Sequence, residues 1–363
     1  MKVKFKKDRA EFHKAVTRSV NEYFEFGRRN NKANFFMYFK TLFFLSILIV
    51  SYTGLLFGNF NLLTAYILWM SLGLSSVFLA VNCGHDAIHG AYSNKKWINS
   101  LMSKSFDLLG VNSYLWSITH NIVHHTYTSI DGADGDVDSV PFTRLTPNQK
   151  WKPFHKYQPI YIFFLYSFGT LFWVFIKDYK KFFKREIGNY KNKRHAPIQY
   201  FNLFFYKTIY YIIFLALPLV IIDMPWLYIV GGFAISHLAE GLTIATIFAL
   251  AHIVEKAQFP MPDEKGNMEN NWAVHQMCTT ADFGRKSRLT SFFTGGLNFQ
   301  IEHHLFPAIC HIYYPEISEI VKEKAFEHGI PYNDYGTIFE ALISHIRQLD
   351  KLGRPIVPHL AKA

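Results

Sequence analysis

The stretch Gly296-Leu297-Asn298-Phe299-Gln300-Ile301-Glu302-His303-His304-Leu305-Phe306 contains two adjacent histidines near the end of the chain. Two earlier stretches gather histidines in a similar way, His85-Asp86-Ala87-Ile88-His89 and His120-Asn121-Ile122-Val123-His124-His125. Neutral imidazole is a common ligand of zinc, copper, iron and nickel. Seven histidines in three clusters are more than one ion usually accepts, so the sequence predicts a site for two metal ions.

The spacing within the clusters fits ligands on helices. His85 and His89 are four residues apart, and on a helix such residues share a face about 5–6 Å apart. His120 and His124 repeat this spacing, and His125 would follow about 100° further round the helix. One such pair would be weak evidence, because solvated or core histidines recur at this spacing by chance. Three dense groups among 17 histidines favour the metal site strongly.

The composition indicates a membrane protein. Half of the 363 residues are hydrophobic and 18% are charged, against about 25% charged in an average soluble chain. The net charge of +11 comes largely from basic residues within 1–40 and 177–194, next to apolar runs, as expected of cytoplasmic loops. This placement argues against a nucleic-acid partner. The three cysteines have unrelated spacings and predict no disulfide framework.

Four apolar runs are long enough to be considered as membrane spans, which need about 20 residues. They form two predicted helical hairpins, Thr41–Phe57 with Leu62–Val81 and Thr208–Ile222 with Trp226–Ala251. Tyr161–Ile176 is also apolar but shorter. At the start of the first run, Lys40 is expected to reach toward the membrane interface with its ammonium group.

The histidine clusters constrain the topology. If they build one site, an even number of crossings must separate His125 from His303, and three apolar segments lie between them. Tyr161–Ile176 is the weakest of the three, so we assign it to the interface or to a shallow re-entrant insertion. Both termini and all three clusters are then expected on the cytoplasmic side.

The predicted fold is an all-α integral membrane protein, with four transmembrane helices in two hairpins and a cytoplasmic helical cap that holds a histidine-rich di-metal site. We expect a single domain over residues 1–363. Its parts are a basic cytoplasmic N-terminus (1–40), the first hairpin (41–81), the first two clusters with the interfacial segment (82–207), the second hairpin (208–251) and the cap with the third cluster (252–363).

The position of the clusters also bears on the substrate. They adjoin the predicted spans, which favours an apolar substrate that partitions into the bilayer. Zinc would suit hydrolysis but has no redox chemistry. The pattern of residues alone leaves zinc and iron both open.

The three clusters and their flanks resemble the three histidine boxes of the membrane fatty-acid desaturases. The segments are Gly-His-Asp-Ala-Ile-His-Gly at 84–90, His-Asn-Ile-Val-His-His-Thr-Tyr-Thr at 120–128 and Asn-Phe-Gln-Ile-Glu-His-His-Leu-Phe-Pro at 298–307. Gln300, where many relatives carry histidine, resembles the front-end and bacterial linoleoyl-CoA desaturase-like branch. The resemblance runs from about residue 35 to 355, including Leu-Gly-Arg-Pro at 352–355.

This resemblance implies an enzyme that uses two iron ions, O₂ as co-substrate and two external electrons to place a cis double bond in an acyl chain. The substrate would be an acyl-CoA or an acyl-lipid. A hydroxylase or ketolase with a similar di-iron site is the alternative. A histidine-rich metal carrier is more remote, because carriers place polar ligands within the spans.

The resemblance also implies a ligand set. Family members use a further histidine at the cytoplasmic end of the last span, and His252 fits that place. Gln300 is a ligand or lies next to one. The expected metal ligands are His85, His89, His120, His124, His125, His252, Gln300, His303 and His304.

Other polar residues are candidates for supporting roles. Carboxylates often hydrogen-bond to the second nitrogen of a ligating imidazole, and sequence adjacency suggests Asp86, Asp136, Asp138 and Glu302. Asp136 and Asp138 belong, with Asp131 and Asp134, to an acidic loop for which a solvated turn is the alternative. His275 is a candidate for contact with a ligand or with substrate, with interface packing as the alternative.

Two further polar residues, His237 and Glu240, lie inside the last predicted span. His237 is 15 residues before His252, or about 22 Å along a helix, so it is not expected to share the metals. We expect a hydrogen-bonded pair or a lining of the acyl tunnel. His311 follows the third cluster and is given a minor chance of a site role. The other histidines are expected at the surface: His13, His155, His195, His328, His345 and His359.

The sequence also departs from one feature of the resemblance. Many front-end desaturases carry a fused b-type cytochrome with a His-Pro-Gly-Gly motif, and that motif does not occur here. We therefore expect electrons from a separate carrier, a b-type cytochrome or a ferredoxin with its reductase. The expected location is a bacterial cytoplasmic membrane.

Overall fold

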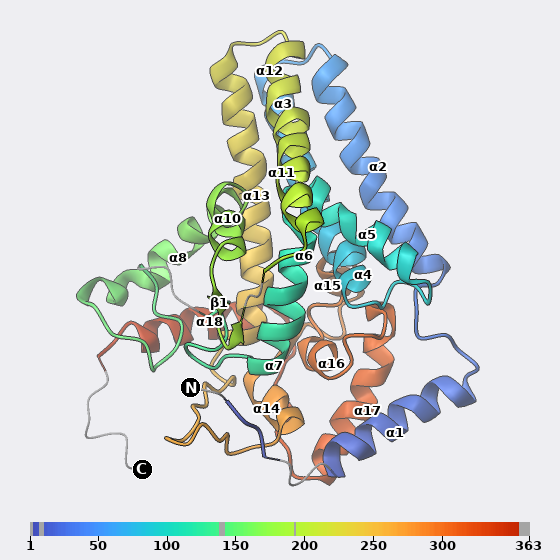
Figure 1. Ribbon diagram of the computed structural model, residues 1–363, viewed down its shortest axis with the longest axis vertical. Coiled ribbons are helices and arrows are strands. Elements are labelled where there is room, and N and C mark those ends of the chain that lie inside the picture. Colours follow the sequence, from blue (N-terminus) through green and yellow to red (C-terminus); the bar gives the residue numbers. More distant parts are fainter. Residues whose placement is uncertain (1–2, 7–10, 138–141, 192–193, 356–363) are drawn as a thin grey trace.

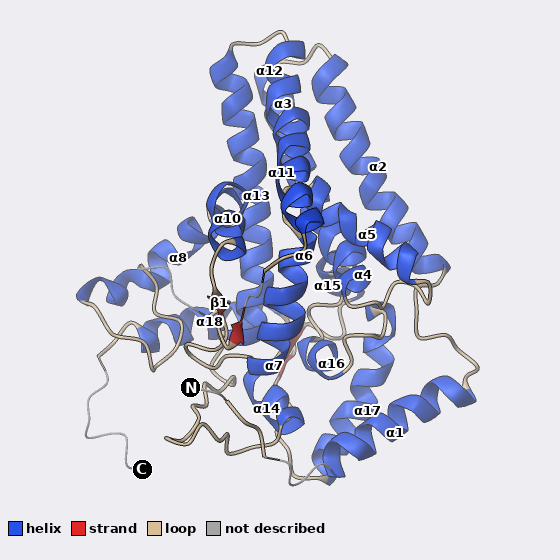
Figure 2. Cartoon of the chain, viewed as in Figure 1, coloured by secondary structure: helices blue, strands red, loops and turns tan. Residues whose placement is uncertain are grey.

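The computed structural model describes residues 3–6, 11–137, 142–191 and 194–355. The longest helices form a bundle at one end of the molecule, and the shorter elements gather in a wider body at the other end (Figure 1). Helices dominate the chain (Figure 2), and the named strands form two short pairs. The expectation of an all-α membrane fold is confirmed in these features.

The first two long helices are α2 (Phe35–Phe57) and α3 (Leu62–Leu79), which pack along one another. Each begins at an asparagine whose side chain accepts hydrogen bonds from the first turn, Asn34 for α2 and Asn61 for α3. Such caps satisfy backbone N–H groups that have no partner within the helix. The short Gly58–Asn61 connection makes the two helices antiparallel neighbours.

Helix α3 does not end with its apolar run. It continues through the π-helical turn η1 (Ala80–Gly84) into α4 (His85–Ile88), so that one helical rod covers Leu62–Ile88. The first histidine cluster therefore stands on the direct extension of a long apolar helix. This continuity fixes the cluster relative to the bundle.

The second pair of long helices follows the same plan. α11 (Pro197–Tyr211), η5 (Ile212–Ala216) and α12 (Leu217–Ile221) form one rod, and α13 (Trp226–His252) returns beside it. α13 also packs against α3, with which it makes the most extensive helix contact of the bundle. His252 is the last residue of α13, so its position is set by the end of this helix.

In the described part of the chain, four helical rods are long and apolar enough to cross a membrane, which confirms the predicted number. They are Phe35–Phe57, Leu62–Ile88, Pro197–Ile221 and Trp226–His252. The segment predicted at the interface lies in a pair of helices, Pro153–Ser167 and Gly169–Phe182, bent by 57°. That bend fits either a broken span or a re-entrant loop, and the pair would be a fifth span if its halves acted together.

Two of the rods begin before the predicted apolar runs, and the lysine that precedes each of those runs is buried. Lys40 was expected to reach the interface, yet it is 1% exposed and its Nζ lies 2.8 Å from Nε2 of His311. Lys207, taken as the residue before a span, is also buried and its Nζ lies 2.9 Å from Oδ2 of Asp178. A buried ammonium needs such partners, and partners distant in sequence are not visible in a hydropathy pattern.

The remaining elements form the body that holds the site. Between the two pairs of long helices lie α5 (Lys96–Leu108), α6 (Ser113–Trp116), η2 (Ser117–His124), α7 (His125–Tyr127), η3 (Pro153–Tyr157), α8 (Gln158–Ser167), α9 (Gly169–Phe172), η4 (Trp173–Lys177), α10 (Asp178–Phe182), β1 (Glu186–Ile187) and β2 (Tyr190–Lys191). Before and after the bundle lie α1 (Glu11–Phe26), α14 (Trp272–Thr279), β3 (Asp282–Phe283), α15 (Arg288–Thr294), α16 (Gln300–Leu305), η6 (His311–Tyr313), α17 (Tyr314–Glu327), β4 (Asp334–Tyr335) and α18 (Ile338–Leu352).

The body has its own apolar core. α1 packs on α17, and their buried faces join with α14 and α16 in one cluster that includes Val16, Met277, Ile301 and Ile317. β1 pairs with β2 in antiparallel fashion, and β3 pairs with β4 in parallel. This core holds α16, which carries the third histidine cluster, beside α4 and the end of α13, where His303 contacts His85 and Gln300 contacts His252.

Candidate metal centre

The nine predicted ligands come together from four parts of the fold. The end of the first long rod, the η2–α7 segment, the last residue of α13 and the short helix α16 each contribute side chains. All nine are buried except His89, which is half-buried. The set comprises His85, His89, His120, His124, His125, His252, Gln300, His303 and His304.

The first group consists of His85, His89, His120 and His303. Each offers a ring nitrogen, and these four atoms lie within 4.8 Å of one another. Nε2 of His85 and Nε2 of His120 are 3.1 Å apart. Two nitrogens that each lie about 2.1 Å from one ion are separated by a similar distance, so this group has the spacing of a shared metal site.

The second group consists of His124, His252 and His304, whose ligand atoms also lie within 4.8 Å of one another. The side-chain amide of Gln300 adjoins this group, with its Nε2 3.0 Å from Nε2 of His252 and 3.2 Å from Nε2 of His304. A half-turn of the amide brings Oε1, a metal-binding oxygen, to the same place. The second group therefore offers three imidazoles and one amide.

His125 lies between the two groups. Its ring contacts His303 of the first group and His304 of the second, with centroids 4.6 and 4.4 Å away. Its Nε2 is 3.3 Å from Nε2 of His120. The two groups are thus neighbours, as a site for two ions requires.

The π-helical turn η2 explains how the second cluster serves both groups. His120 and His124 were expected on one face of a helix, and their rings do stack with centroids 5.3 Å apart, but their ligand nitrogens belong to different groups. In η2 the backbone bond runs from His125 N to His120 O, five residues back. The wider turn brings His125 over His120 and carries His124 toward His252. Single π-helical turns occur frequently at functional sites.

Hydrogen bonds to the outer nitrogens orient several rings toward the centre. Nδ1 of His124 lies 2.9 Å from Oδ2 of Asp134, and Nδ1 of His304 lies 2.8 Å from Oε1 of Gln276. Nδ1 of His303 is 3.4 Å from the hydroxyl of Tyr314. A ring that donates from Nδ1 has its lone pair on Nε2, which is the usual arrangement of a metal-ligating histidine.

The inner nitrogens fit a metal for a second reason. Among the described residues, the buried Nε2 atoms of His89, His124 and His303 have no hydrogen-bond partner. An unsatisfied buried polar atom costs about 1–3 kcal/mol, and coordination to an ion would satisfy all three. The donor set is imidazole-rich, which suits iron as well as zinc or copper.

Burial also favours the metal-binding form of the rings. It lowers the pKa of His120, His125, His303 and His304 well below the usual value, helped by the neighbouring imidazoles. These rings are therefore neutral at physiological pH. Burial acts in the same direction on the pKa of His124, but the carboxylates of Asp134 and Asp136 outweigh it and raise that pKa.

The predicted supporting carboxylates lie in different places. Asp136 lies 3.9 Å from Nδ1 of His124, behind the closer Asp134, and Asp138 lies outside the described residues. The carboxylate of Asp86 accepts from the backbone and Nδ1 of His311. Successive helical residues point about 100° apart, so Asp86 turns away from its neighbour His85.

Glu302 also points away from the histidines beside it. The hydroxyl of Tyr332 donates to Oδ2 of Asp282 and lies 3.0 Å from Oε1 of Glu302. Burial raises the pKa of both carboxyl groups. Asp282 also accepts from the backbone N of Ile301, so this cluster ties α16 to β3.

His275 is connected to the second group through Thr128. Its Nε2 donates to the backbone oxygen of Thr128, whose hydroxyl lies 3.2 Å from Nδ1 of His304. Sequence reasoning missed Gln276, Tyr314 and Thr128 as partners of the rings. Gln276 is 28 residues and Tyr314 is 10 residues from His304, so no short motif marks them, whereas Thr128 ends the second box and carried a local signal.

Three histidines expected at the surface are buried, so that expectation is wrong for His155, His195 and His345. The rings of His195 and His345 bond to groups from distant segments; Nδ1 of His345, for example, donates to the oxygen of Ile253 at 2.7 Å. Nδ1 of His155 accepts from the backbone N of Lys152. His311 is buried as well, between Lys40 and Asp86. Of the remaining three, His13 is half-buried, His328 is exposed and His359 lies outside the described residues.

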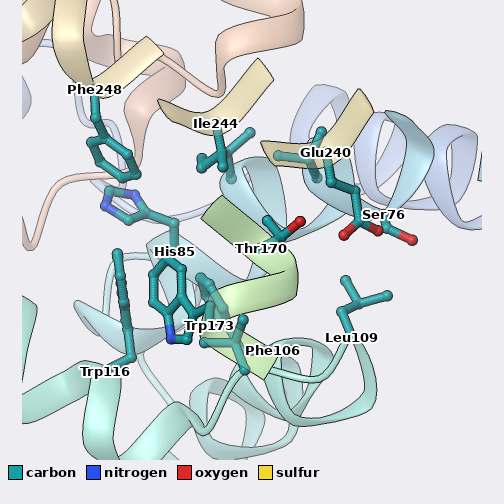
Figure 3. Close-up of a pocket in the computed structure, with 14 residues that line it drawn as sticks. Ser76, His85, Phe106, Leu109, Trp116, Thr170, Trp173, Glu240, Ile244 and Phe248 are labelled. Carbon is teal, nitrogen blue, oxygen red and sulfur yellow. The ribbon is translucent and has the colours of Figure 1, made fainter. Parts of the chain in front are cut away.

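An apolar cavity leads from the first group into the bundle (Figure 3). His85, Trp116 and Phe248 lie at one end of it, and Glu240 and Ser76 lie at the other. The ring of Trp116 stacks on the imidazole of His120, with centroids 4.7 Å apart. Its full lining is Ser76, Val77, Ala80, Val81, His85, Phe106, Leu109, Val111, Trp116, Thr170, Trp173, Glu240, Ile244 and Phe248.

One wall of the cavity follows the helical period of α13. Glu240, Ile244 and Phe248 are four residues apart on α13, and the next step of this stripe is His252. Residues four apart share one face of a helix. A single face of α13 therefore runs from the polar end of the cavity to the second group of histidines.

His237 and Glu240 form a hydrogen-bonded cluster at the far end of this cavity. Nδ1 of His237 is 3.3 Å from Oε2 of Glu240, and its Nε2 is 2.7 Å from the hydroxyl of Tyr210. The hydroxyl of Thr170 lies 3.0 Å from the same Nδ1. Glu240 lines the cavity, whereas His237 stands behind it.

Comparison with known proteins agrees with this geometry. Residues 61–336 match the family model described as fatty acid desaturase. An sn-1 linoleoyl-lipid 6-desaturase of Arthrospira platensis is 34% identical over 94% of this chain and 92% of its own length, and one of Synechocystis sp. is 32% identical over 97% and 98%. An acyl-lipid (8-3)-desaturase of Physcomitrium patens is 33% identical over 94% of this chain and 72% of its own length. The chain therefore belongs to the fatty acid desaturase family and is an oxidoreductase.

Proposed function

We propose that this enzyme is a front-end acyl-lipid desaturase that holds two iron ions in the two histidine groups. The observation that supports this most is the apolar cavity that begins at His85 and ends between the long helices. It offers an extended hydrocarbon chain a path directly past a histidine-rich centre. We assign nine ligands to that centre: His85, His89, His120, His124, His125, His252, Gln300, His303 and His304.

The lining of the cavity suits a substrate without polar groups near the reacting carbons. Trp116, Trp173 and Phe248 surround the end nearest the first group, and the ring of Trp116 contacts that of Trp173 at a tilt, with centroids 4.9 Å apart. Large rigid rings of this kind restrict where methylene groups can lie. They also exclude water from the space next to His85 and His120. The substrate carbons would be held by shape, because unactivated methylenes offer no hydrogen bonds.

Iron in the two groups would supply the reduction of O₂. The overall reaction removes two hydrogens from adjacent methylenes and takes two electrons and two protons from outside, so that O₂ leaves as two waters and the chain gains a cis double bond. The residues of this chain hold the acyl chain and orient the ligands. The electrons come from a separate carrier, which we propose to be a b-type cytochrome or a ferredoxin with its reductase.

The names of the relatives indicate a class of substrate for this chain. Two of them are linoleoyl-lipid 6-desaturases and another is an acyl-lipid (8-3)-desaturase. We propose by similarity that this chain also acts on an acyl-lipid and adds its double bond between an existing one and the ester. An acyl-CoA substrate is the alternative that the assay should distinguish.

We place the centre, both termini and the body on the cytoplasmic side of a bacterial membrane. The basic residues of 1–40 and 177–194 support this orientation, since cytoplasmic loops are enriched in Lys and Arg. The four rods would then cross the membrane and the bent pair would not. A cysteine label at Lys180, which is exposed, should react only from the cytoplasmic side.

The test of the function is a product profile. The full chain is expressed in a host that supplies electron carriers and a polyunsaturated lipid precursor, and its fatty acids are identified by mass spectrometry. A new double bond on the carboxyl side of an existing one, appearing first in intact lipids, is the expected result. A hydroxyl or keto product without a new double bond would overturn desaturation, and product appearing first in acyl-CoA would overturn the lipid substrate. His303→Ala should abolish the product.

A further inference from the structure

A second, smaller cavity lies beyond the end of the first one. Ser76, Leu109 and Glu240 line both. Deeper in the bundle the second cavity is lined by Trp69, Leu72, Tyr210, Phe214, Phe233 and Ser236. The two cavities therefore meet at a partition formed by these three shared residues. Figure 3 shows Glu240, Ser76 and Leu109 together at the end opposite His85 and Trp116.

Among the three shared residues, Glu240 contacts His237, a buried residue that lines neither cavity. Thr170 donates its hydroxyl proton to the backbone oxygen of His237 at 2.9 Å, and Tyr210 can donate to Nε2 of the same ring at 2.7 Å. That leaves the proton of the neutral ring on Nδ1, which donates to Oγ1 of Thr170 at 3.0 Å, and Oε2 of Glu240 lies 3.3 Å from the same Nδ1. The carboxyl group thus lies against a buried ring that Thr170 of α9 and Tyr210 of α11 hold in place.

We propose that Glu240 closes the acyl cavity and sets the longest hydrocarbon tail that the enzyme accepts; this inference rests on the proposed function. The residue stands 12 positions before His252 on α13, or about 18 Å along the helix. A tail that enters past the centre reaches the Glu240 side chain at its methyl end. The second cavity is the space that a longer tail would take if that side chain were smaller.

Two physical effects act in the same direction at this position. The side chain fills the passage between the cavities, so a longer tail meets it directly. A carboxyl group pressed against a methyl group also loses hydration without gaining a hydrogen bond, which is unfavourable. The apolar lining on both sides of the partition, from Ile244 and Val77 to Phe214 and Phe233, would otherwise accept hydrocarbon.

The experiment measures chain-length preference in full-length protein. Membranes containing wild type, Glu240→Ala or Glu240→Gln receive an equal mixture of two lipids that differ only in the length of the acyl tail beyond the existing double bonds. The ratio of long to short desaturated product is determined by mass spectrometry. Glu240→Gln is the matched control, because its side chain has nearly the same size and keeps a polar end.

Glu240→Ala is expected to raise the long-to-short ratio about tenfold, the scale at which a pocket discriminates small changes in hydrocarbon length, and Glu240→Gln to leave it near the wild-type value. Adding Leu72→Phe to Glu240→Ala should reverse the gain, because Leu72 lines the second cavity and the larger ring refills it. If Glu240→Ala does not accumulate in the membrane, Glu240→Ser makes a similar opening and the same ratio decides.

The possible outcomes distinguish a failure of the role of Glu240 from a failure of the proposed function. Desaturation by the wild type with an unchanged ratio in Glu240→Ala or Glu240→Ser overturns the role of Glu240 and leaves the proposed function standing. An equal rise in Glu240→Gln overturns the steric closure, because charge alone would then set the limit. No desaturated product from wild type, in membranes that contain the protein, overturns the proposed function and this inference with it.

Discussion

Oδ2 of Asp134 lies 2.9 Å from Nδ1 of His124, and both side chains are buried. The same carboxylate oxygen accepts from the backbone N of Ser129, which fixes its direction. Asp134 therefore sets the tautomer of His124 and turns Nε2 toward His252 and His304. The arrangement joins the second histidine cluster to the acidic loop that follows it.

Replacing Asp134 should weaken the metal site more than it weakens the fold. Asp134→Asn keeps the shape but removes the negative charge that favours a proton on Nδ1 of His124. Partners of this kind contribute about 10- to 100-fold to metal affinity or activity, so we expect a loss of iron and of desaturated product on that scale. Iron is measured per chain in purified protein. Asp131→Asn, in the same loop, is the control, and equal iron in both variants would contradict the role of Asp134.

Substitutions at Gln300 should distinguish a ligand from a hydrogen-bond donor. Gln300→Ala removes the amide beside His252 and His304, and we expect about half of the iron to be lost because only the second group is affected. Gln300→Glu offers a carboxylate oxygen in the same place but no N–H donor. Retention of iron in Gln300→Glu is the expected result. If that variant loses as much iron as Gln300→Ala, the amide acts through its N–H groups.

Filling the acyl cavity should stop turnover without removing iron. Ile244 lines the cavity midway between Glu240 and Phe248, and Ile244→Trp would occupy the path of the chain. We expect the desaturation rate to fall by more than about tenfold while the iron content stays at the wild-type value. Leu242→Trp places the same side chain on an exposed position of the same helix and should keep its activity. Normal turnover in Ile244→Trp would show that the acyl chain lies elsewhere.

Acidification should destabilise the protein through His345. Burial lowers its pKa from 6.5 to about 4, so the folded ring stays neutral while the unfolded chain takes up a proton below pH 6.5. The contribution of His345 to the free energy of unfolding is therefore fully present above pH 6.5 and is lost as the pH falls toward 4. At about 1.4 kcal/mol per pKa unit, the loss is about 3 kcal/mol.

The measurement is the pH dependence of the thermal unfolding midpoint in detergent, compared between wild type and His345→Gln. Glutamine can still donate to the oxygen of Ile253 but does not titrate in this range. Its midpoint should fall less steeply with acid than that of wild type. Parallel curves for the two proteins would mean that His345 is not protonated on unfolding in this interval.

The sequence alone predicted the features that depend on neighbouring residues. Apolar runs of sufficient length predicted the four long helices, and the confirmed number follows from the hydrocarbon thickness that such helices match. The three clusters predicted a concentration of imidazoles, and the structure brings all three together with His252. Two of the helices begin before the predicted apolar runs, and the lysines that limit those runs in the sequence, Lys40 and Lys207, are buried and paired in the fold.

What the sequence determined by itself was the membrane class, the histidine-rich centre and the family, because each is written in local composition or in short motifs. The tertiary structure decided how the ligands divide into two groups, because the π-helical turn sends His120 and His124 to different partners. It also decided which side chains orient the rings, as Asp134 and Gln276 do, and where the cavity ends at Glu240. These relationships depend on contacts between helices far apart in the chain, which no local spacing encodes.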